Sequence, residues 1–124
     1  MEDLRTELHN AYVSAKAPGW YAGEGEPVQA ETYEEAKRFL AALPDSFKPT
    51  DILPDPHGDL TFEWSANRGR VMLVSFDGKK RAIFAVRFSD EEKASGQAPF
   101  LNQIPTVVSY FLGRFLSLDE RTQQ

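Results

Sequence analysis

Asp55, His57 and Asp59 occupy alternate positions in the short stretch "DPHGD". Carboxylates and imidazoles are metal ligands, and alternate residues of an extended segment point to the same side. The pattern therefore allows a small metal-dependent hydrolase built on these three residues. Asp, Pro and Gly also gather in turns for backbone reasons alone, and the chain has one other histidine, His9. The turn is the favoured interpretation, and no cofactor is expected.

A glycine-rich stretch, "GWYAGEGEPV", runs from residue 19 to residue 28. Its Gly-x-Gly pattern suggests phosphate binding only when it follows a strand. Here it follows a helical pattern, and Glu24 and Glu26 would repel an anion. The glycines and the proline predict a turn between two helices, with Trp20 packed into the core. Glu24 and Glu26 have no role in that turn, so they become candidates for partner binding.

The acidic residues are concentrated in the first half of the chain. Residues 1–63 carry 13 acidic and 5 basic side chains, a net charge of −8, whereas residues 64–124 carry 6 and 9, a net of +3. We expect acidic helices to lie on a basic sheet and neutralise it. An exposed acidic surface that occupies a basic groove is the alternative. The candidate partner-binding residues are Glu24, Glu26, Glu31, Glu34, Glu35 and Tyr21.

Six basic residues fall within twenty positions of the second half and raise the alternative of a nucleic-acid-binding module. In a β-meander, successive turns lie at opposite ends of the sheet, so this sequence cluster is not expected to form one patch. Aromatic stacking platforms of the kind found in RNA-binding sheets are also missing from the pattern. Direct nucleic-acid binding is therefore less favoured than protein binding. The six residues are Arg68, Arg70, Lys79, Lys80, Arg81 and Arg87.

Apolar residues at helical spacing predict three helices. The first covers residues 2–16 and the second residues 30–43, with Thr32 and Glu35 at capping-box spacing and Gln29 or Ala30 as other starting points. The third begins near Asn102 and carries the most regular apolar stripe of the chain. We expect it to pack on a sheet.

Between the second and third helices the apolar residues alternate instead, which predicts strands. The segments 60–66, 70–76 and 81–88 form a three-stranded antiparallel meander, joined by "NRG" and "DGKK" turns. The middle strand is apolar on both faces except at Ser75, a pattern typical of a strand covered on both sides. Residues 44–59 are interpreted as an extended connector and residues 89–98 as a mobile polar loop. The expected fold is α+β.

Length and composition fit one domain over residues 1–124 of a soluble, cytoplasmic protein. The chain has no cysteine, so disulfides, thiolate metal sites and cysteine nucleophiles are excluded. The first residues lack the pattern of a secretory signal. The longest apolar stretch, "IPTVVSYFLGRFLSL", is too short and too interrupted to span a membrane.

Residues 19–88 resemble a group of small bacterial proteins of unknown function. The resemblance rests on a Gly-Trp-x-x-Gly-x-Gly-x-x-Pro-like loop, a short following helix and a strand ending in Glu-Trp. The matching stretches here are "GWYAGEGEPV", "ETYEEAKRFLAALP" and "LTFEW", with "RVMLVSF" after them. The group has no established activity, so the resemblance implies a shared fold and assigns no catalytic residue.

The interpretation that these patterns favour is a non-enzymatic accessory protein that binds and modulates another macromolecule. An antitoxin, an immunity-type protein and a phage-type inhibitor all fit this class. No serine lies in a Gly-x-Ser-x-Gly motif, and no nucleophile and base are paired by a motif. The expected partner is a protein, including a basic nucleic-acid-binding protein, and a homodimer is compatible with the sequence.

Overall fold

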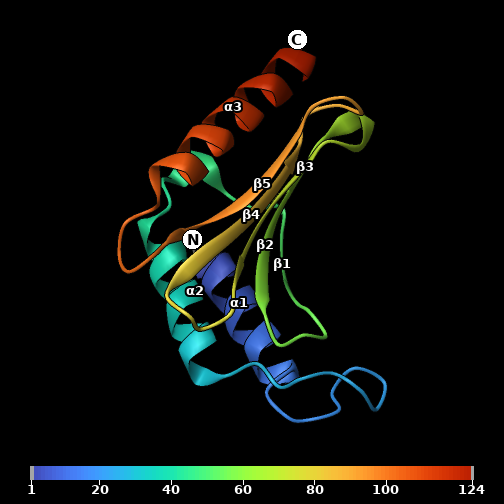
Figure 1. Ribbon diagram of the computed structural model, residues 1–124, viewed down its shortest axis with the longest axis vertical. Coiled ribbons are helices and arrows are strands. Elements are labelled where there is room, and N and C mark those ends of the chain that lie inside the picture. The colour runs from blue at the N-terminus through green and yellow to red at the C-terminus, as the bar shows by residue number, and fades with distance from the viewer. Residues whose placement is uncertain (1, 124) are drawn as a thin grey trace.

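The computed structural model describes residues 2–123, and the side chains of residues 3–118. Three α-helices, two short 3-10 helices and five strands follow one another along the chain (Figure 1). The helices are α1 (Glu2–Ser14), α2 (Ala30–Ala42) and α3 (Thr106–Gln123), and the 3-10 helices are η1 (Asp45–Phe47) and η2 (Asn67–Gly69). The strands are β1 (Asp51–Pro54), β2 (Leu60–Ser65), β3 (Val71–Phe76), β4 (Arg81–Arg87) and β5 (Lys93–Pro99).

The five strands form one antiparallel sheet in the order β1-β2-β3-β4-β5. The α+β class and the central meander are confirmed, but the prediction of three strands is wrong. The segment 44–59 contains η1 and β1, and the segment 89–98 supplies most of β5. The third helix begins at Thr106 and not near Asn102, because Pro105 lies just before its first turn.

The two additional strands lie at the edges of the sheet, where little apolar surface is buried. In β1 only Ile52 is buried. In β5 no residue is buried, and the positions that face the helices are Ala94, Gly96 and Ala98. Both strands are therefore held mainly by backbone pairing, which leaves no apolar alternation in the sequence.

The core lies between one face of the sheet and the three helices. Phe39 of α2 is at its centre, with ring centroids of Phe62 and Phe76 each 5.0 Å away and that of Phe100 6.0 Å away. On α3, Phe111 contacts Phe84 of β4 at a centroid distance of 5.5 Å. One connected cluster of buried apolar side chains links all these elements.

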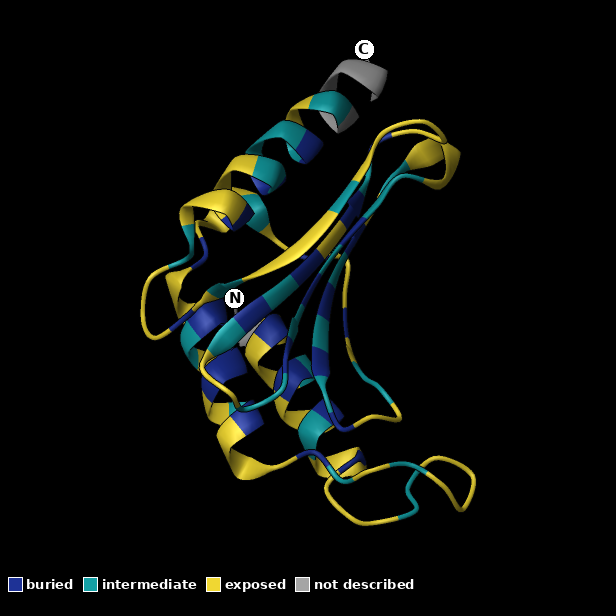
Figure 2. Ribbon diagram, viewed as in Figure 1, coloured by how far each residue is buried: buried dark blue, intermediate teal, exposed yellow. Residues whose placement is uncertain are grey.

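The three α-helices lie on the same side of the sheet (Figure 1). On β2, β3 and β4, buried side chains alternate with side chains that are mostly partly exposed, as Figure 2 shows. We call the face that points away from the helices the outer face. The expectation that the middle strand is covered on both sides is wrong for this chain, because no described element covers the outer face of β3.

Candidate partner-binding surface

Residues 19–28 form a small closed hairpin that we call the glycine loop. Tyr21 and Glu24 exchange two backbone hydrogen bonds, with N···O distances of 2.9 and 2.8 Å. The two residues between them, Ala22 and Gly23, have φ angles of 51° and 86°. Positive φ at both central positions is the backbone of a tight two-residue hairpin turn. A non-glycine residue in this conformation is strained, so the fold imposes the shape on Ala22.

The glycine loop is closed by an internal hydrogen bond, and its second half is tied to the rest of the molecule by two more. The indole Nε1 of Trp20 donates to the carbonyl oxygen of Glu26 at 2.7 Å. The backbone N–H of Glu26 donates to the carbonyl oxygen of Pro56 at 2.8 Å, and that of Val28 to the carbonyl oxygen of Ala15 at 2.8 Å. Trp20 is half-buried and packs against the core, as expected. The loop is therefore a preorganised element.

Three side chains of the glycine loop project into solvent. Tyr21 is 53% exposed, and Glu24 and Glu26 are exposed as well. The Tyr21 ring stands edge-on to the Trp20 ring at a centroid distance of 5.7 Å, which holds its position. The carboxylates of Glu24 and Glu26 form no hydrogen bond or ion pair with the described residues. These two charges are not needed to hold the loop in place.

The first turns of α2 divide the three remaining glutamates between two roles. Glu31 and Glu34 are exposed, and Glu34 forms an ion pair with Lys37 at 3.1 Å. Glu35 is only 2% exposed, so its assignment to an accessible acidic surface is wrong. Of the helix starts that the sequence left open, the structure shows the one at Gln29 and Ala30: α2 begins at Ala30, Gln29 precedes it without a side-chain cap, and the capping box at Thr32 and Glu35 is not used.

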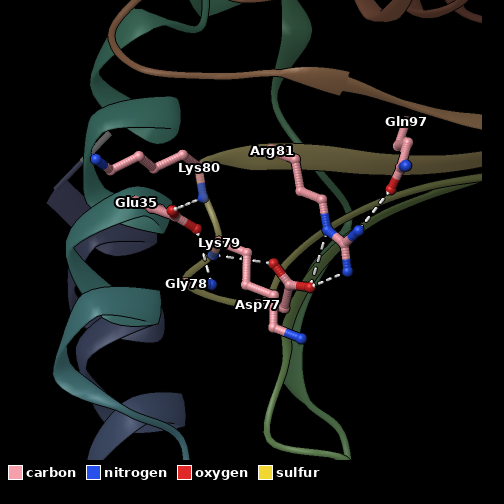
Figure 3. A network of polar contacts seen from close by, with 7 residues as sticks. All are labelled: Glu35, Asp77, Gly78, Lys79, Lys80, Arg81 and Gln97. Carbon is pink, nitrogen blue, oxygen red and sulfur yellow. Dashed lines mark hydrogen bonds and ion pairs between the residues drawn. The ribbon is translucent and has the colours of Figure 1, made fainter.

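The Glu35 carboxylate instead accepts hydrogen bonds from the turn between β3 and β4 (Figure 3). Its two oxygens accept hydrogen bonds from the backbone N–H groups of Gly78 at 2.9 Å and Lys80 at 2.6 Å. Both residues have positive φ, of 81° and 61°. A helix carboxylate thus satisfies two donors of a tight turn that would otherwise be left unpaired.

The "DPHGD" stretch forms the turn from β1 to β2. The Asp55 side chain accepts backbone hydrogen bonds from His57 at 2.8 Å and Asp59 at 3.2 Å, so this carboxylate stabilises the turn. His57 is exposed. Throughout the part of the chain that the structure describes, no three His, Asp, Glu or Cys side chains are grouped closely enough to hold a metal ion. The geometry does not bring Asp55, His57 and Asp59 together as ligands.

Asp59 lies in a local field of other acids. Burial raises the pKa of Asp59 to about 6, and the negative charges of Asp55 and Asp77 add to this effect. Burial also raises the pKa of Asp77, but hydrogen bonds from the Arg81 guanidinium and the Lys79 N–H outweigh it and leave that pKa below its ordinary value. The pKa values of these two neighbouring carboxyl groups are therefore shifted in opposite directions.

Arg81 connects Asp77 to the edge strand β5 on the outer face (Figure 3). Its Nε and Nη2 donate to one carboxylate oxygen of Asp77 at 3.0 and 2.6 Å, and its Nη1 donates to Gln97 Oε1 at 2.9 Å. This network fastens the β3–β4 turn to the adjacent strand. It also neutralises one of the basic residues counted in the sequence.

Three basic side chains of the second half of the chain pair with acids of that same half, and none of these three acids belongs to a helix. Arg81 pairs with Asp77, Arg87 pairs with Asp90, and Arg114 pairs with Glu92 at 2.7 Å. The expectation of acidic helices on a basic sheet is therefore wrong as a description of these contacts. The separation of the basic turns is confirmed. η2, which contains Arg68, joins β2 to β3 at one end of the sheet, whereas Lys79 and Lys80 lie in the β3–β4 turn at the other end.

The outer face of the sheet is a surface that the sequence-based candidates omit. Val71 and Leu73 point to it from β3, and Ile83 and Ala85 from β4. A hollow of about 380 Å³ lies among residues that include Val71, Leu73, Ala85 and Lys93. Its signal was present in the sequence as the two apolar faces of the middle strand. That pattern predicted a strand covered on both sides.

α3, with 18 residues, is the longest helix. No helix within the described residues has both the length and the apolar character needed to cross a membrane.

No protein-family model, curated protein or solved structure matches the chain. The resemblance to small bacterial proteins stays a prediction.

Proposed function

We propose that this protein is a non-enzymatic accessory protein that binds and modulates another macromolecule through the glycine loop. The antitoxin, immunity-type and phage-type inhibitor classes are the kinds of accessory protein included in this proposal. The observation that carries the proposal is the rigid presentation of Tyr21, Glu24 and Glu26 on a strained, hydrogen-bonded hairpin. Backbone strain of this kind is concentrated at functional positions, and preorganisation lowers the entropy that binding would cost.

The partner we infer is a protein with a basic surface, of which a nucleic-acid-binding protein is one kind. Tyr21 offers a large side chain with a polar end, the type of residue that dominates interface energies. Glu24 and Glu26 form no ion pair within the described part of the chain, so a basic partner would supply the cations that pair with them. Glu31 and Glu34 extend the acidic surface onto α2 and would increase the association rate at low salt.

The two alternative functions find less support in the geometry. A metal-dependent hydrolase would need Asp55, His57 and Asp59 to converge, but Asp55 is engaged by the backbone of its own turn. A nucleic-acid-binding module would need free cations in one patch. Arg81, Arg87 and Arg114 are each paired with a carboxylate.

The proposal is tested by affinity capture from a lysate of the native host with three forms of the chain. Glu24→Lys/Glu26→Lys reverses the two charges of the loop. Asp45→Lys/Glu91→Lys is the matched control, because both residues are exposed acids in other parts of the molecule and the total charge change is the same. We expect the wild type and the control to retain one partner, and the loop variant to lose it roughly tenfold or more.

Tyr21→Ala provides a second variant that leaves the net charge unchanged. It should weaken the same interaction without altering the circular dichroism of the protein. Capture of no partner above background by the wild type would contradict the proposal. Equal capture by the loop variant and the control would place the contact elsewhere on the molecule and would remove the glycine loop from it.

A further inference from the structure

The outer face of the sheet carries apolar side chains at its centre and no covering layer. Leu73 of β3 lies opposite Ala85 of β4, and Ile83 lies opposite Ser75 in the next row on the same face. Val71 extends this apolar strip along β3. A central strand with two apolar faces is typical of a sheet buried on both sides. We propose that a second copy of this chain packs on the outer face and forms a homodimer.

The edges of the sheet are poorly suited to self-association. β1 has four residues and ends at Pro54, and β5 begins at Lys93 and ends at Pro99. Short edge strands, lysines and prolines are the features that prevent strands from pairing with another chain. Association through the face therefore agrees better with the sequence of the edges than extension of the sheet does.

Charge on the outer face is divided between its two sides. Asp51 of β1 and Glu63 of β2 lie opposite each other on one side. Arg87 of β4 and Lys93 of β5 lie opposite each other on the other side. Arg87 is paired with Asp90, so Lys93 is the cation that this side offers to a second copy. Among the described residues, the outer positions of β1 and β2 include no cation and those of β4 and β5 no acid. A face with this distribution is complementary to a second copy of itself.

A twofold axis parallel to the strands and passing over β3 uses this complementarity. It places β1 and β2 of one copy over β4 and β5 of the other. By the strand register, Asp51 then lies over Ser95 of the other copy, two residues along β5 from Lys93. An axis across the strands would place like charges over one another. Packed sheets lie about 10 Å apart, a gap that long charged side chains can bridge from both surfaces.

The size of the face fits a dimer at the weak end of stable interfaces. Five strands of four to seven residues, spaced about 4.8 Å apart at about 3.3 Å per residue, cover roughly 500 Å² in projection. The accessible area of a ridged side-chain surface is larger than its projection, and a standard interface buries about 800 Å² on each partner. We therefore expect a dissociation constant in the micromolar range.

The proposed axis has a consequence for the glycine loop. Because rotation about an axis parallel to the strands preserves the position along them, both glycine loops lie at the same end of the dimer. A dimeric or repetitive partner would then be bound through two loops at once. The dimer surface and the glycine loop are separate, so either proposal can fail without the other.

The first test measures molecular mass by light scattering and sedimentation over a series of protein concentrations. We expect the wild type to shift from monomer to dimer as concentration rises, and Leu73→Glu to remain monomeric. Leu101→Glu is the matched control, because Leu101 is an exposed apolar residue, 60% accessible, in the loop before α3. It should dimerise like the wild type.

A charge exchange gives a second test that does not depend on an apolar-to-acid substitution. Asp51→Lys and Lys93→Glu should each weaken dimerisation about tenfold or more, and the double variant should restore it. Both residues are exposed in the monomer, so folding is expected to be unaffected. Restoration would show that the charges of the two sides of the face interact across the dimer.

Three results would overturn the proposal. A wild type that stays monomeric up to high micromolar concentrations would leave the outer face to a different occupant. A dimer that survives Leu73→Glu and shows no coupling between Asp51 and Lys93 would use another surface. A heterologous protein that binds the face while the free chain remains monomeric would likewise contradict self-association.

Discussion

The carboxylate of Glu35 and the backbone N–H of Lys80 are joined by a 2.6 Å hydrogen bond across 45 residues of sequence. The second oxygen of the same carboxylate accepts from Gly78 at 2.9 Å. This contact fixes the β3–β4 turn against the beginning of α2. The same turn holds Asp77, whose carboxylate binds Arg81 on the outer face. One buried acid therefore connects the helical layer to the polar network of the sheet.

Replacement of Glu35 by alanine should be costly because it leaves two partly buried N–H donors without acceptors. We expect a loss of about 2–4 kcal/mol in the free energy of unfolding, measured by urea denaturation. Glu34→Ala, one position away on the exposed side of the helix, should change it by less than about 0.5 kcal/mol. Similar losses for both variants would mean that the Glu35 contacts contribute little.

The stability of the protein should depend on pH through Asp59. Its pKa is about 6 in the folded chain, against an ordinary value of 3.8, so the folded state binds a proton more readily than the unfolded state. The contribution of Asp59 is therefore complete below about pH 4 and is lost as the pH rises to about 6. Above that range the charged carboxylate destabilises the fold.

Asp59→Asn should remove this dependence. Because a pKa difference of one corresponds to about 1.4 kcal/mol, and because Asp59 is partly exposed, we expect a gain of about 1–2 kcal/mol at neutral pH. At about pH 4 the two proteins should be equally stable. Urea unfolding curves across this pH range provide the measurement. An exposed acid, Asp45, gives the control: a pH-dependent difference of the same size in Asp45→Asn would argue against the assignment.

Sequence patterns predicted those parts of the fold that bury apolar side chains periodically. The helices and the strands β2, β3 and β4 belong to this group. β5 has the sequence "KASGQAP", in which the residues facing the helices are small, and Gly96 leaves room for the ring of Phe84. Such an edge strand is held by backbone pairing, so the pattern of apolar residues in the sequence does not predict it.

The role of each acidic residue could not be read from its type. Glu31, Glu34 and Glu35 are adjacent in sequence and equally suited to the start of a helix. Only the docking of the β3–β4 turn separates Glu35 from the other two, and that contact joins segments 43 and 45 residues apart. The exposure of the outer face could not be predicted for a related reason. A strand that is apolar on both faces predicts a covering layer on each side, but its sequence does not show which chain supplies the second layer.

Two glycines of the glycine loop should differ in their tolerance of a side chain. A Cβ at Gly25 would lie 2.9 Å from Tyr21 Cβ and 3.2 Å from Trp20 Nε1, whereas a Cβ at Gly23 would meet no atom within 4 Å. Both residues have positive φ, of 96° and 86°, so the conformational cost of alanine is similar. Gly25→Ala should therefore destabilise the loop more than Gly23→Ala, by about 1–3 kcal/mol.

Amide hydrogen exchange at Tyr21 and Glu24 is the measurement, because the two residues exchange backbone hydrogen bonds. Faster exchange is expected in Gly25→Ala than in Gly23→Ala, by roughly tenfold or more. Equal exchange rates would mean that the Trp20 and Tyr21 side chains move aside without cost. In that case the loop is less rigid than its contacts indicate, and preorganisation would no longer support partner binding.

The two tryptophans perform the same task with different consequences for stability. Trp64 Nε1 donates to the carbonyl oxygen of Phe47 at 3.0 Å and Trp20 Nε1 to that of Glu26 at 2.7 Å, so each indole holds a loop. Trp64 is only 1% exposed, whereas Trp20 is half-buried. Water can replace the lost donor at Trp20 but not at Trp64.

Trp64→Phe should therefore lower the free energy of unfolding by about 1–3 kcal/mol, from an unpaired carbonyl and an underfilled core. Trp20→Phe should cost less than about 1 kcal/mol globally while it loosens the glycine loop. Urea denaturation reports the first effect, and amide exchange at Glu24 reports the second. A loss of more than about 1 kcal/mol in the free energy of unfolding of Trp20→Phe would mean that the glycine loop unfolds together with the core. A partner would then bind a surface that opens only when the whole protein unfolds.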